Sequence, residues 1–313
     1  MAHYVLPASP DTCFWGFFAA ETPPVLHVAS GDEVTIEALP AGGLDDLHRD
    51  AARCLGEHRP TLEALLTRKG PGAHVLSGPV HVAGAAPGDV LQVDIMEARP
   101  RQDWGLAKII PLKGTLPEDF PEFRRFMIDM DPAAGTARLP WGTELPLDPF
   151  FGIMAVAPPP NWGMIDTAEP RLHGGNMDNK DLRPGATLYL PVFNDGALFS
   201  AGDGHGVQGD GEVCITALET ALTGRFRLTV RKDLAAPVPF AETEEHLISM
   251  GFDADLDDAA KTAVRRMIDL ICARSGRTRE EAYVLASLAG DFKVTQLVDG
   301  EKGIHGVLAK SAL

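Results

Sequence analysis

The sequence predicts an α+β fold built mainly of β-strands, in β-sandwich or barrel-like modules, with a few helices, the clearest near the C-terminus. Three segments lead to this prediction: 25–37, 84–94 and 182–190. Each places a glycine in a tight turn and then alternates residues into a strand, because glycine supplies the positive φ that such turns need. The same pattern occurs in both halves of the chain, which indicates related β modules.

Residues 256–275 form the clearest predicted helix. Its apolar side chains recur at spacings of three and four, as an amphipathic helix requires. They are Ala260, Val264, Met267, Ile268 and Ile271. Gly276 is expected to end this helix in a left-handed conformation. Thr278 followed by Glu281 predicts a capping box that opens a second helix over 279–288.

Two further elements and one boundary complete the predicted fold. Residues 44–55 are expected to form a helix, and the β-branched run 292–298 a strand. Three successive prolines in 157–160 are incompatible with a helix interior or a central strand. We therefore place a domain boundary at residue 160, between an N-terminal β-rich domain (1–160) and a C-terminal α+β domain (161–313), with one intertwined unit as the alternative.

Composition excludes several classes of function. The chain of 313 residues is 45% hydrophobic, enough for a large core, and its net charge of -16 would repel a nucleic-acid backbone. Its four cysteines form no C-x-x-C pair, which argues against a thiolate zinc site and for a reducing compartment. Signal-peptide and membrane-span patterns are absent from the sequence, so we expect a cytoplasmic protein that does not bind membranes.

The most informative stretch is 198–212, where glycines separate residues with ligand or acid/base chemistry. These residues are Asp203, His205, Gln208, Asp210 and Glu212. Asp203 and His205 are two apart, so a strand would direct them to one face, and Asp210 and Glu212 have the same spacing. A second segment, 173–180, contains Asn176 and Asp178. We expect a hairpin over 182–199 to bring Asp178 alongside Asp203 and His205.

Asp, Glu and His are the expected ligands of a hard or borderline divalent cation. A catalytic cation lowers the pKa of a bound water and polarises a carbonyl, while a nearby carboxylate moves the proton. The spacing matches no standard zinc signature. A solvated glycine-rich loop and a structural calcium loop therefore remain open as alternatives.

Other residues suggest weaker candidates. His74 and His81 are lone histidines close to an apparent strand, where a structural role is the usual one. Cys214 would share a strand face with Glu212, so it is either a nucleophile or a small buried hydrophobe. The sequence contains no G-x-S-x-G elbow, P-loop or dinucleotide-binding unit.

At the level of these segments the chain resembles the acetamidase/formamidase family. The G-N-M-D and G-D-G-H-G-V-Q-G-D-G-E motifs are the specific part, and the strand-turn pieces are weaker individually. The matching pieces are 77–95 (SGPVHVAGAAPGDVLQVDI), 151–158 (FGIMAVAP), 173–182 (HGGNMDNKDL), 190–214 (LPVFNDGALFSAGDGHGVQGDGEVC), 288–299 (LAGDFKVTQLVD) and 303–310 (GIHGVLAK).

The resemblance implies a metal-associated hydrolase of linear amides other than peptides, which releases ammonia and a carboxylate. It also implies a β-rich α+β fold and a homodimer or higher homo-oligomer. One departure is visible, because Gly206 and Val207 follow the histidine where alanine-like residues are expected. The positions carried over are Asn176, Asp178, Asp203, His205, Gln208, Asp210 and Glu212.

On this basis we expect a metal-dependent amidase for a small substrate such as formamide or acetamide. Asp178, Asp203 and His205 are the expected ligands of a divalent metal, with zinc preferred and calcium the alternative. Glu212 is the expected general acid/base, with Asp210 as its partner. Asn176 or Gln208 would orient the amide. The alternatives are a Cys214-nucleophile amidase and a non-catalytic small-ligand or calcium-binding module on the same scaffold.

Overall fold

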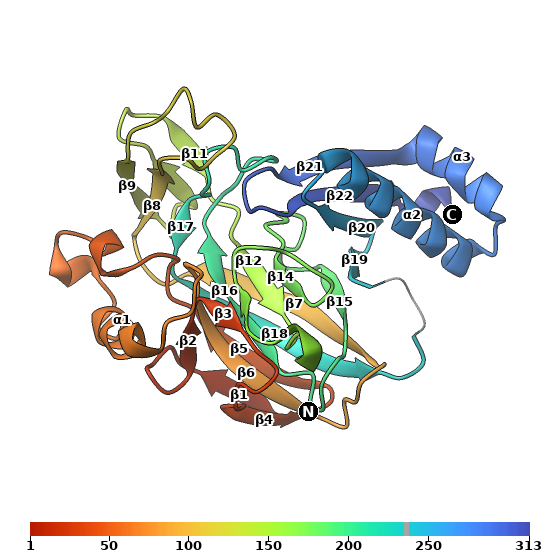
Figure 1. The fold of residues 1–313 in the computed structure, drawn as a ribbon, viewed down its shortest axis with the longest axis horizontal. Coiled ribbons are helices and arrows are strands. Elements are labelled where there is room, and N and C mark those ends of the chain that lie inside the picture. Colours follow the sequence, from red (N-terminus) through yellow and green to blue (C-terminus); the bar gives the residue numbers. More distant parts are fainter. Residues whose placement is uncertain (235–237) are drawn as a thin grey trace.

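The computed structural model describes residues 1–234 and 238–313, and it confirms a mainly β fold with few helices (Figure 1). The first large sheet has nine strands, and it runs from the body of the protein into a C-terminal lobe. In sheet order its strands are β1 (His3–Leu6), β5 (Asp32–Glu37), β18 (Leu222–Arg231), β7 (Val90–Pro100), β15 (Thr187–Pro191), β19 (Phe240–Glu242), β20 (His246–Asp253), β22 (Lys302–Ala309) and β21 (Gly290–Gln296).

The second large sheet has eleven strands. Its main path is β11 (Glu144–Pro146), β10 (Thr136–Arg138), β9 (Arg124–Asp131), β8 (Trp104–Ile109), β17 (Glu219–Thr220), β16 (Phe199–His205), β12 (Phe150–Ala155) and β14 (Gly174–Asn176). Beside β16 lies β6 (Val75–Ala83), which also pairs with β2 (Cys13–Trp15) and β4 (Leu26–Ala29). A small third sheet pairs β3 (Phe17–Phe18) with β13 (Ile165–Asp166).

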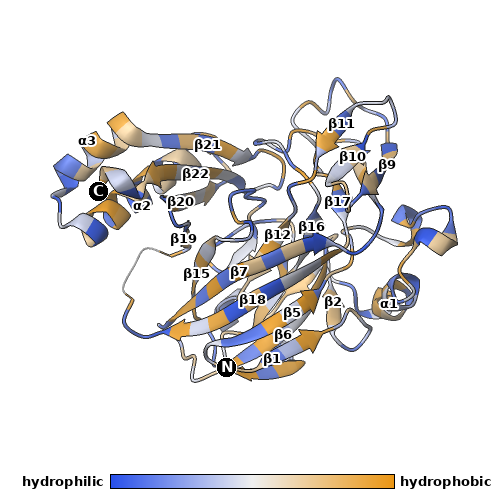
Figure 2. Ribbon diagram, turned by 180° about the vertical axis from the view of Figure 1, so that it is seen from behind, coloured by the Kyte–Doolittle hydropathy of each residue, from blue (hydrophilic) through white to orange (hydrophobic). Residues whose placement is uncertain are grey.

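The main core lies between the two large sheets. Side chains alternate along β5, where Val34 and Ile36 are fully buried, and Figure 2 shows the same alternation of polar and apolar residues along β5, β7 and β18. Phe226 of β18 packs edge-on against Phe151 of β12 and Phe199 of β16, with ring centroids 5.2 and 5.7 Å apart. Apolar packing against β18 therefore fixes the position of β12 and β16 in the core.

Helices α2 (Leu256–Ser275) and α3 (Arg279–Ala289) pack with β20, β21 and β22 in the C-terminal lobe (Figure 1). The predicted helix 256–275 is confirmed, and Gly276 ends it at φ 70°. The capping box between Thr278 and Glu281 is also confirmed. The predicted strand at 292–298 is present as β21, two residues earlier at each end. Within residues 1–234 and 238–313, no helix has the length and apolar content needed to cross a membrane.

The predicted helix at 44–55 is wrong. Only two 3-10 turns form there, η1 (Leu44–Asp46) and η2 (Ala51–Arg53), and α1 begins later, at His58–Leu65. The Asp50 side chain accepts a hydrogen bond from the Ala52 N–H, and Nδ1 of His48 accepts one from the Asp50 N–H. Such local bonds to the backbone compete with helix formation. The other 3-10 turns are η3 (Leu66–Arg68), η4 (Pro160–Trp162) and η5 (Lys310–Ala312).

The predicted hairpin over 182–199 is also wrong, because β15 and β16 belong to different sheets. The turn glycines of the three predicted turn-strand segments do adopt positive φ, at 90° for Gly31, 95° for Gly88 and 96° for Gly185. The division at residue 160 stays a prediction. Both large sheets contain strands from either side of it.

Candidate functional site

Strand pairing gathers acidic side chains around one histidine at the middle of the eleven-stranded sheet. Strand β16 carries Asp203 and His205, and its pairing with β17 sets Glu219 opposite His205. Strand β12 pairs with β16 on one side and β14 on the other. The carbonyl of Gly152 in β12 accepts a hydrogen bond from the Asp178 N–H at 3.2 Å, which brings Asp178 to the same place.

The His205 ring is the centre of this cluster. Its Nε2 lies 3.3 Å from Oδ2 of Asp203, 3.5 Å from Oε1 of Glu219 and 3.8 Å from Oδ1 of Asp178. Glu212 joins from the loop after β16. Its carboxylate, the Asp178 carboxylate and the His205 imidazole each offer one potential ligand atom, and these atoms lie within 4.8 Å of one another. All of these side chains are buried.

Gln208 fixes the orientation of the His205 ring. Its Oε1 lies 2.9 Å from Nδ1 of His205, and its Nε2 donates a hydrogen bond to the carbonyl of Asp178 at 2.7 Å. Because Oε1 can only accept, the proton of a neutral His205 belongs on Nδ1, with this assignment following from the hydrogen-bond pattern. The lone pair of Nε2 then points toward the carboxylates, as in a metal-binding imidazole.

The C-terminal lobe also reaches the site. The Gly211 N–H donates to the carbonyl of Thr295 at 2.9 Å, and the Leu297 N–H donates to the carbonyl of Gly211 at 3.1 Å. These bonds hold the backbone next to Glu212. Two residues beyond Leu297, Asp299 places a buried carboxylate oxygen at the cluster, where burial and the charge of Asp178 raise its pKa.

The backbone is strained where the acidic residues sit. Asp178, Asp203 and Glu212 have φ of 47°, 57° and 43°, in the left-handed region that non-glycine residues rarely occupy. Such strain persists only where the surroundings enforce it, and it concentrates at functional sites. A methyl group at Gly152 would lie 2.5 Å from Oδ2 of Asp203 and 2.8 Å from Cε1 of His205. Glycine at this position therefore allows the side chains to converge.

Burial and mutual charge shift the proton affinities of the cluster. Burial, together with neighbouring carboxylates, raises the pKa of Asp178 and, to a greater extent, that of Glu212. Burial likewise raises the pKa of Glu219 to about 8. Burial opposes charge on His205, but the carboxylates of Glu219 and Asp203 outweigh it and raise its pKa to about 10. The site therefore favours added positive charge.

These carboxylates have oxygens for which the described residues provide no hydrogen-bond partner. The buried oxygens without a hydrogen-bond partner are Oδ1 of Asp178, Oδ1 of Asp203, Oε2 of Glu212, Oε2 of Glu219 and Oδ2 of Asp299. Buried acceptors of this kind are costly unless a cation, a proton or a water meets them. Carboxylate oxygens and an imidazole nitrogen are suitable ligands for zinc and other divalent cations, so the residues fit such an ion.

Comparison with known proteins identifies the family. The model of the "Acetamidase/Formamidase family" matches residues 17–165 and 162–305. The chain belongs to this family. Its curated relatives include a formamidase from Methylophilus methylotrophus, 29% identical over 62% of this chain and 58% of that protein, and an acetamidase from Mycolicibacterium smegmatis, 28% identical over 45% and 49%. The chain thus spans about half the length of the curated relatives it matches.

Solved structures of acetamidases have the same fold as this family member over nearly its whole chain. An acetamidase from Bacillus halodurans has a TM-score of 0.84 at 30% identity, covering 97% of both chains. A predicted acetamidase/formamidase from Thermoanaerobacter tengcongensis has a TM-score of 0.85 at 28% identity, covering 99% of this chain and 97% of that one. A gamma lactamase from Delftia acidovorans shares the fold, with a TM-score of 0.63 at 21% identity.

The structure of this acetamidase/formamidase family member brings together most of the residues predicted for the site. Asp178, Asp203, His205 and Glu212 lie in the cluster, with Gln208 behind His205. Asp210 does not join them, because its Oδ2 pairs with Nζ of Lys180 at 2.9 Å near the surface. The segment 210–212 is a loop rather than a strand, so the expected common face of Asp210 and Glu212 is absent.

Asn176 is buried beside Asp178. Its Nδ2 donates to the carbonyl of Ala168 at 3.1 Å, while its Oδ1 is buried without a partner. Gln208 differs from Asn176, because both ends of its amide are already engaged by the protein. Of the two residues predicted to orient the amide, Asn176 is therefore the one with an unengaged acceptor oxygen.

Of the weaker candidates, only His74 lies close to the carboxylate cluster. Nε2 of His74 lies 4.0 Å from Oδ1 of Asp203, at the edge of the cluster. His81 instead packs against His27, with ring centroids 4.8 Å apart and the ring planes tilted by 34°. Cys214 is exposed, and its Sγ donates to the carbonyl of Thr216 at 3.7 Å.

Sequence reasoning missed Glu219 and Asp299. Glu219 lies in A-L-E-T-A, with no motif around it, and only the pairing of β16 with β17 reveals its position. The signal that could have found it is a single acidic residue inside a short apolar run, where burial is expensive without a partner. Asp299 follows the predicted strand 292–298 and ends the matching piece 288–299, in which the sequence predicts a strand and no site residue.

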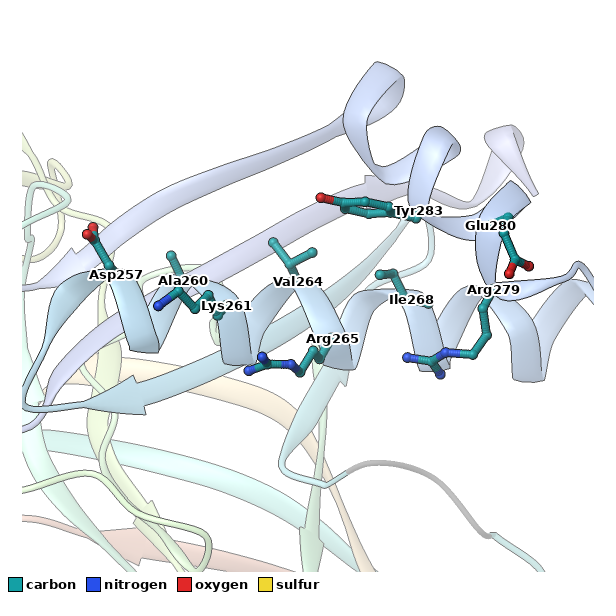
Figure 3. Close-up of a pocket in the computed structure, with 9 residues that line it drawn as sticks. All are labelled: Asp257, Ala260, Lys261, Val264, Arg265, Ile268, Arg279, Glu280 and Tyr283. Carbon is teal, nitrogen blue, oxygen red and sulfur yellow. The ribbon is translucent and has the colours of Figure 1, made fainter.

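The groove between α2 and α3 is not the site. It has a volume of about 560 Å³, and Figure 3 shows side chains such as Lys261, Arg265 and Tyr283 along it. None of the residues described as lining it belongs to the carboxylate cluster. The groove and the carboxylate cluster are therefore separate features of the structure.

Proposed function

We propose that this protein hydrolyses a small linear amide to a carboxylate and ammonia, and that a divalent cation bound by the carboxylate cluster assists it. The observation that carries the proposal is the set of buried carboxylates of Asp178, Asp203 and Glu219 around Nε2 of His205, each of which has one buried oxygen without a hydrogen-bond partner among the described residues. Family membership and relatives called formamidase and acetamidase support the choice of amide. Zinc is the first choice of cation and calcium the alternative, because an imidazole ligand favours zinc.

His205, Asp178 and Asp203 would hold the cation. Gln208 keeps Nε2 of His205 directed into the cluster, so the ligand set is oriented before the ion arrives. When bound, the ion lowers the pKa of a water and polarises the substrate carbonyl. Burial of the cluster keeps bulk water away, so its charges act in a low dielectric.

Glu212 is the proposed proton carrier. Its carboxyl group is buried, its Oε2 has no partner, and its pKa is raised by burial and by Asp178. A carboxylate at this position would accept a proton from the attacking water as the new C–O bond forms. It would then deliver that proton to the amide nitrogen as the C–N bond breaks, so that ammonia leaves. Asp210 pairs with Lys180 at the surface, and we propose Glu219 as the partner carboxylate instead.

Asn176 would orient the substrate. Its buried, unpartnered Oδ1 is an acceptor suited to the NH₂ group of a primary amide. Removal of that acceptor should raise KM more than it lowers kcat, since the contact exists in the ground state. Homo-oligomeric assembly and a cytoplasmic location stay predictions from the sequence.

Ammonia release from formamide and acetamide tests the proposal. Purified protein should release ammonia, lose that activity after chelation and regain it with added zinc or calcium. Glu212→Gln should lower kcat by about 100-fold or more, as loss of a general acid/base does. Asp210→Asn is the matched control and should stay within about threefold of the original rate. No ammonia from either amide by metal-loaded protein would contradict the proposal.

A further inference from the structure

A mainly apolar cavity of about 250 Å³ lies against the carboxylate cluster. Gln208 and Glu212 are among the residues that line it, so it adjoins the residue proposed as the proton carrier. The lobe formed by β8 to β11, together with the loop after β16, supplies the rest of the wall. The apolar residues of that wall include Ala107, Ile128, Leu139, Leu145, Val207 and Leu218.

Some residues of the wall are packed into the core of the lobe, and others expose apolar surface to the cavity. Ile128 and Leu218 are 4% and 5% exposed, and they belong to the packed core of this lobe. Leu139, Leu145 and Val207 are only half-buried. Apolar surface left wet beside a buried acid gains free energy when a ligand covers it. The cavity is therefore suited to an apolar group joined to the atoms that react at Glu212.

Size and charge restrict that group. A water occupies about 30 Å³ in the liquid, so 250 Å³ holds roughly eight heavy atoms, about twice the size of acetamide. Among the described residues that line the cavity, none is basic, and Asp210 is paired with Lys180. A negatively charged acyl group would find no counter-charge there. An uncharged aliphatic chain fits better.

We propose that this cavity binds the acyl chain of the substrate, and that the preferred substrates are aliphatic primary amides of about four to six carbons. This inference rests on the proposed amide hydrolysis and specifies its substrate class. Val207 and Leu145 line the cavity from two separate elements, the loop after β16 and strand β11. They are positioning residues for the chain and leave the proton transfer to Glu212.

A chain-length series tests the inference. Ammonia release is measured from formamide, acetamide, butyramide, hexanamide and octanamide. We expect kcat/KM to rise about fourfold for each methylene that the cavity covers, and to fall once the chain exceeds it. Val207→Phe should move the optimum to a shorter amide, and Leu145→Ala to a longer one. Leu66→Ala, a change at an exposed leucine in η3, is the control and should leave the profile unchanged.

Binding gives a second readout that does not depend on turnover. In calorimetry, Glu212→Gln protein should bind hexanamide more tightly than acetamide, and Val207→Phe added to it should remove the difference. A kcat/KM that falls from acetamide to hexanamide, or a profile that ignores Val207→Phe, would overturn the inference while leaving amide hydrolysis intact. If no amide in the series released ammonia, the proposed function would fail, and hexanamide binding would still decide whether the cavity takes an aliphatic chain.

Discussion

Oε1 of Gln208 lies 2.9 Å from Nδ1 of His205, in a buried contact that determines which ring nitrogen faces the carboxylates. The other end of the same amide holds the carbonyl of Asp178. One glutamine thus couples two of the proposed metal ligands, which come from separate segments of the chain. Contacts of this kind orient a ligand before an ion binds.

Replacement of Gln208 by leucine should weaken cation binding about 10- to 100-fold, because His205 loses the partner that orients it. The measurement is a zinc titration of metal-free protein by calorimetry. Gln102→Leu is the matched control, since Gln102 is a buried glutamine that donates to the carbonyl of Trp104. Equal zinc affinity in the two variants would show that Gln208 does not position His205.

Gly152→Ala should disable the site while leaving the fold in place. The added methyl would press on the carboxylate oxygens of Asp178 and Asp203 and on the His205 ring. These groups would have to separate, so we expect at least a tenfold loss of metal affinity and of ammonia release. Circular dichroism and metal content are the measurements. Gly56→Ala is the control, since a methyl there meets nothing within 4 Å.

Cys214→Ser should have little effect. Cys214 is exposed and lies outside the carboxylate cluster, so ammonia release should stay within about threefold of the original rate. Steady-state kinetics on acetamide is the measurement, with Asp178→Asn as the contrast expected to lose activity. Loss of turnover in Cys214→Ser would instead support the cysteine-nucleophile mechanism.

His173 should make the protein less stable in acid. Its ring is fully buried against Phe18 and Trp162, with neither nitrogen hydrogen-bonded, and burial, helped by the charge of Arg171, lowers its pKa to about 3. In the unfolded chain the imidazole takes up its proton near pH 6.5. The unfolding free energy should therefore fall as the pH drops from about 6.5 toward 3, by about 2 kcal/mol at pH 5.

Substitution of His173 removes that dependence. In urea unfolding at about pH 7.5 and about pH 5, His173→Leu should lose about 2 kcal/mol less stability than the original protein between the two conditions. The carboxylate cluster is common to both proteins, so its own pH dependence cancels in the comparison. Identical losses would mean that His173 is not held neutral by burial.

The sequence predicts those elements whose signals are local. The helix at 256–275 follows from its apolar stripe and from Gly276 after its last turn, and Thr278 with Glu281 marks the next helix start. The helix expected at 44–55 fails because side chains such as Asp50 bond to nearby backbone groups instead. Apolar spacing alone does not reveal that competition.

The candidate site follows a similar division. Asp203 and His205 could be paired from their spacing, because a strand directs alternate side chains to one face. Asp210 and Glu212 have the same spacing but lie in a loop, so one points to Lys180 and the other into the cluster. Glu219 and Asp299 arrive through strand pairing and through the C-terminal lobe. Those contacts are tertiary: the apolar run around Glu219 indicates that its side chain is buried, but not which groups it meets.

The central claim is that the carboxylate cluster binds a divalent cation. Anomalous diffraction at the zinc absorption edge, from crystals of active protein prepared without chelator, tests it most directly. We predict a peak about 2 Å from Nε2 of His205, bonded also to a carboxylate oxygen of Asp178 or Asp203. A map from active protein with no anomalous peak in the cluster at the zinc edge or at longer wavelength, where calcium scatters, would contradict the claim.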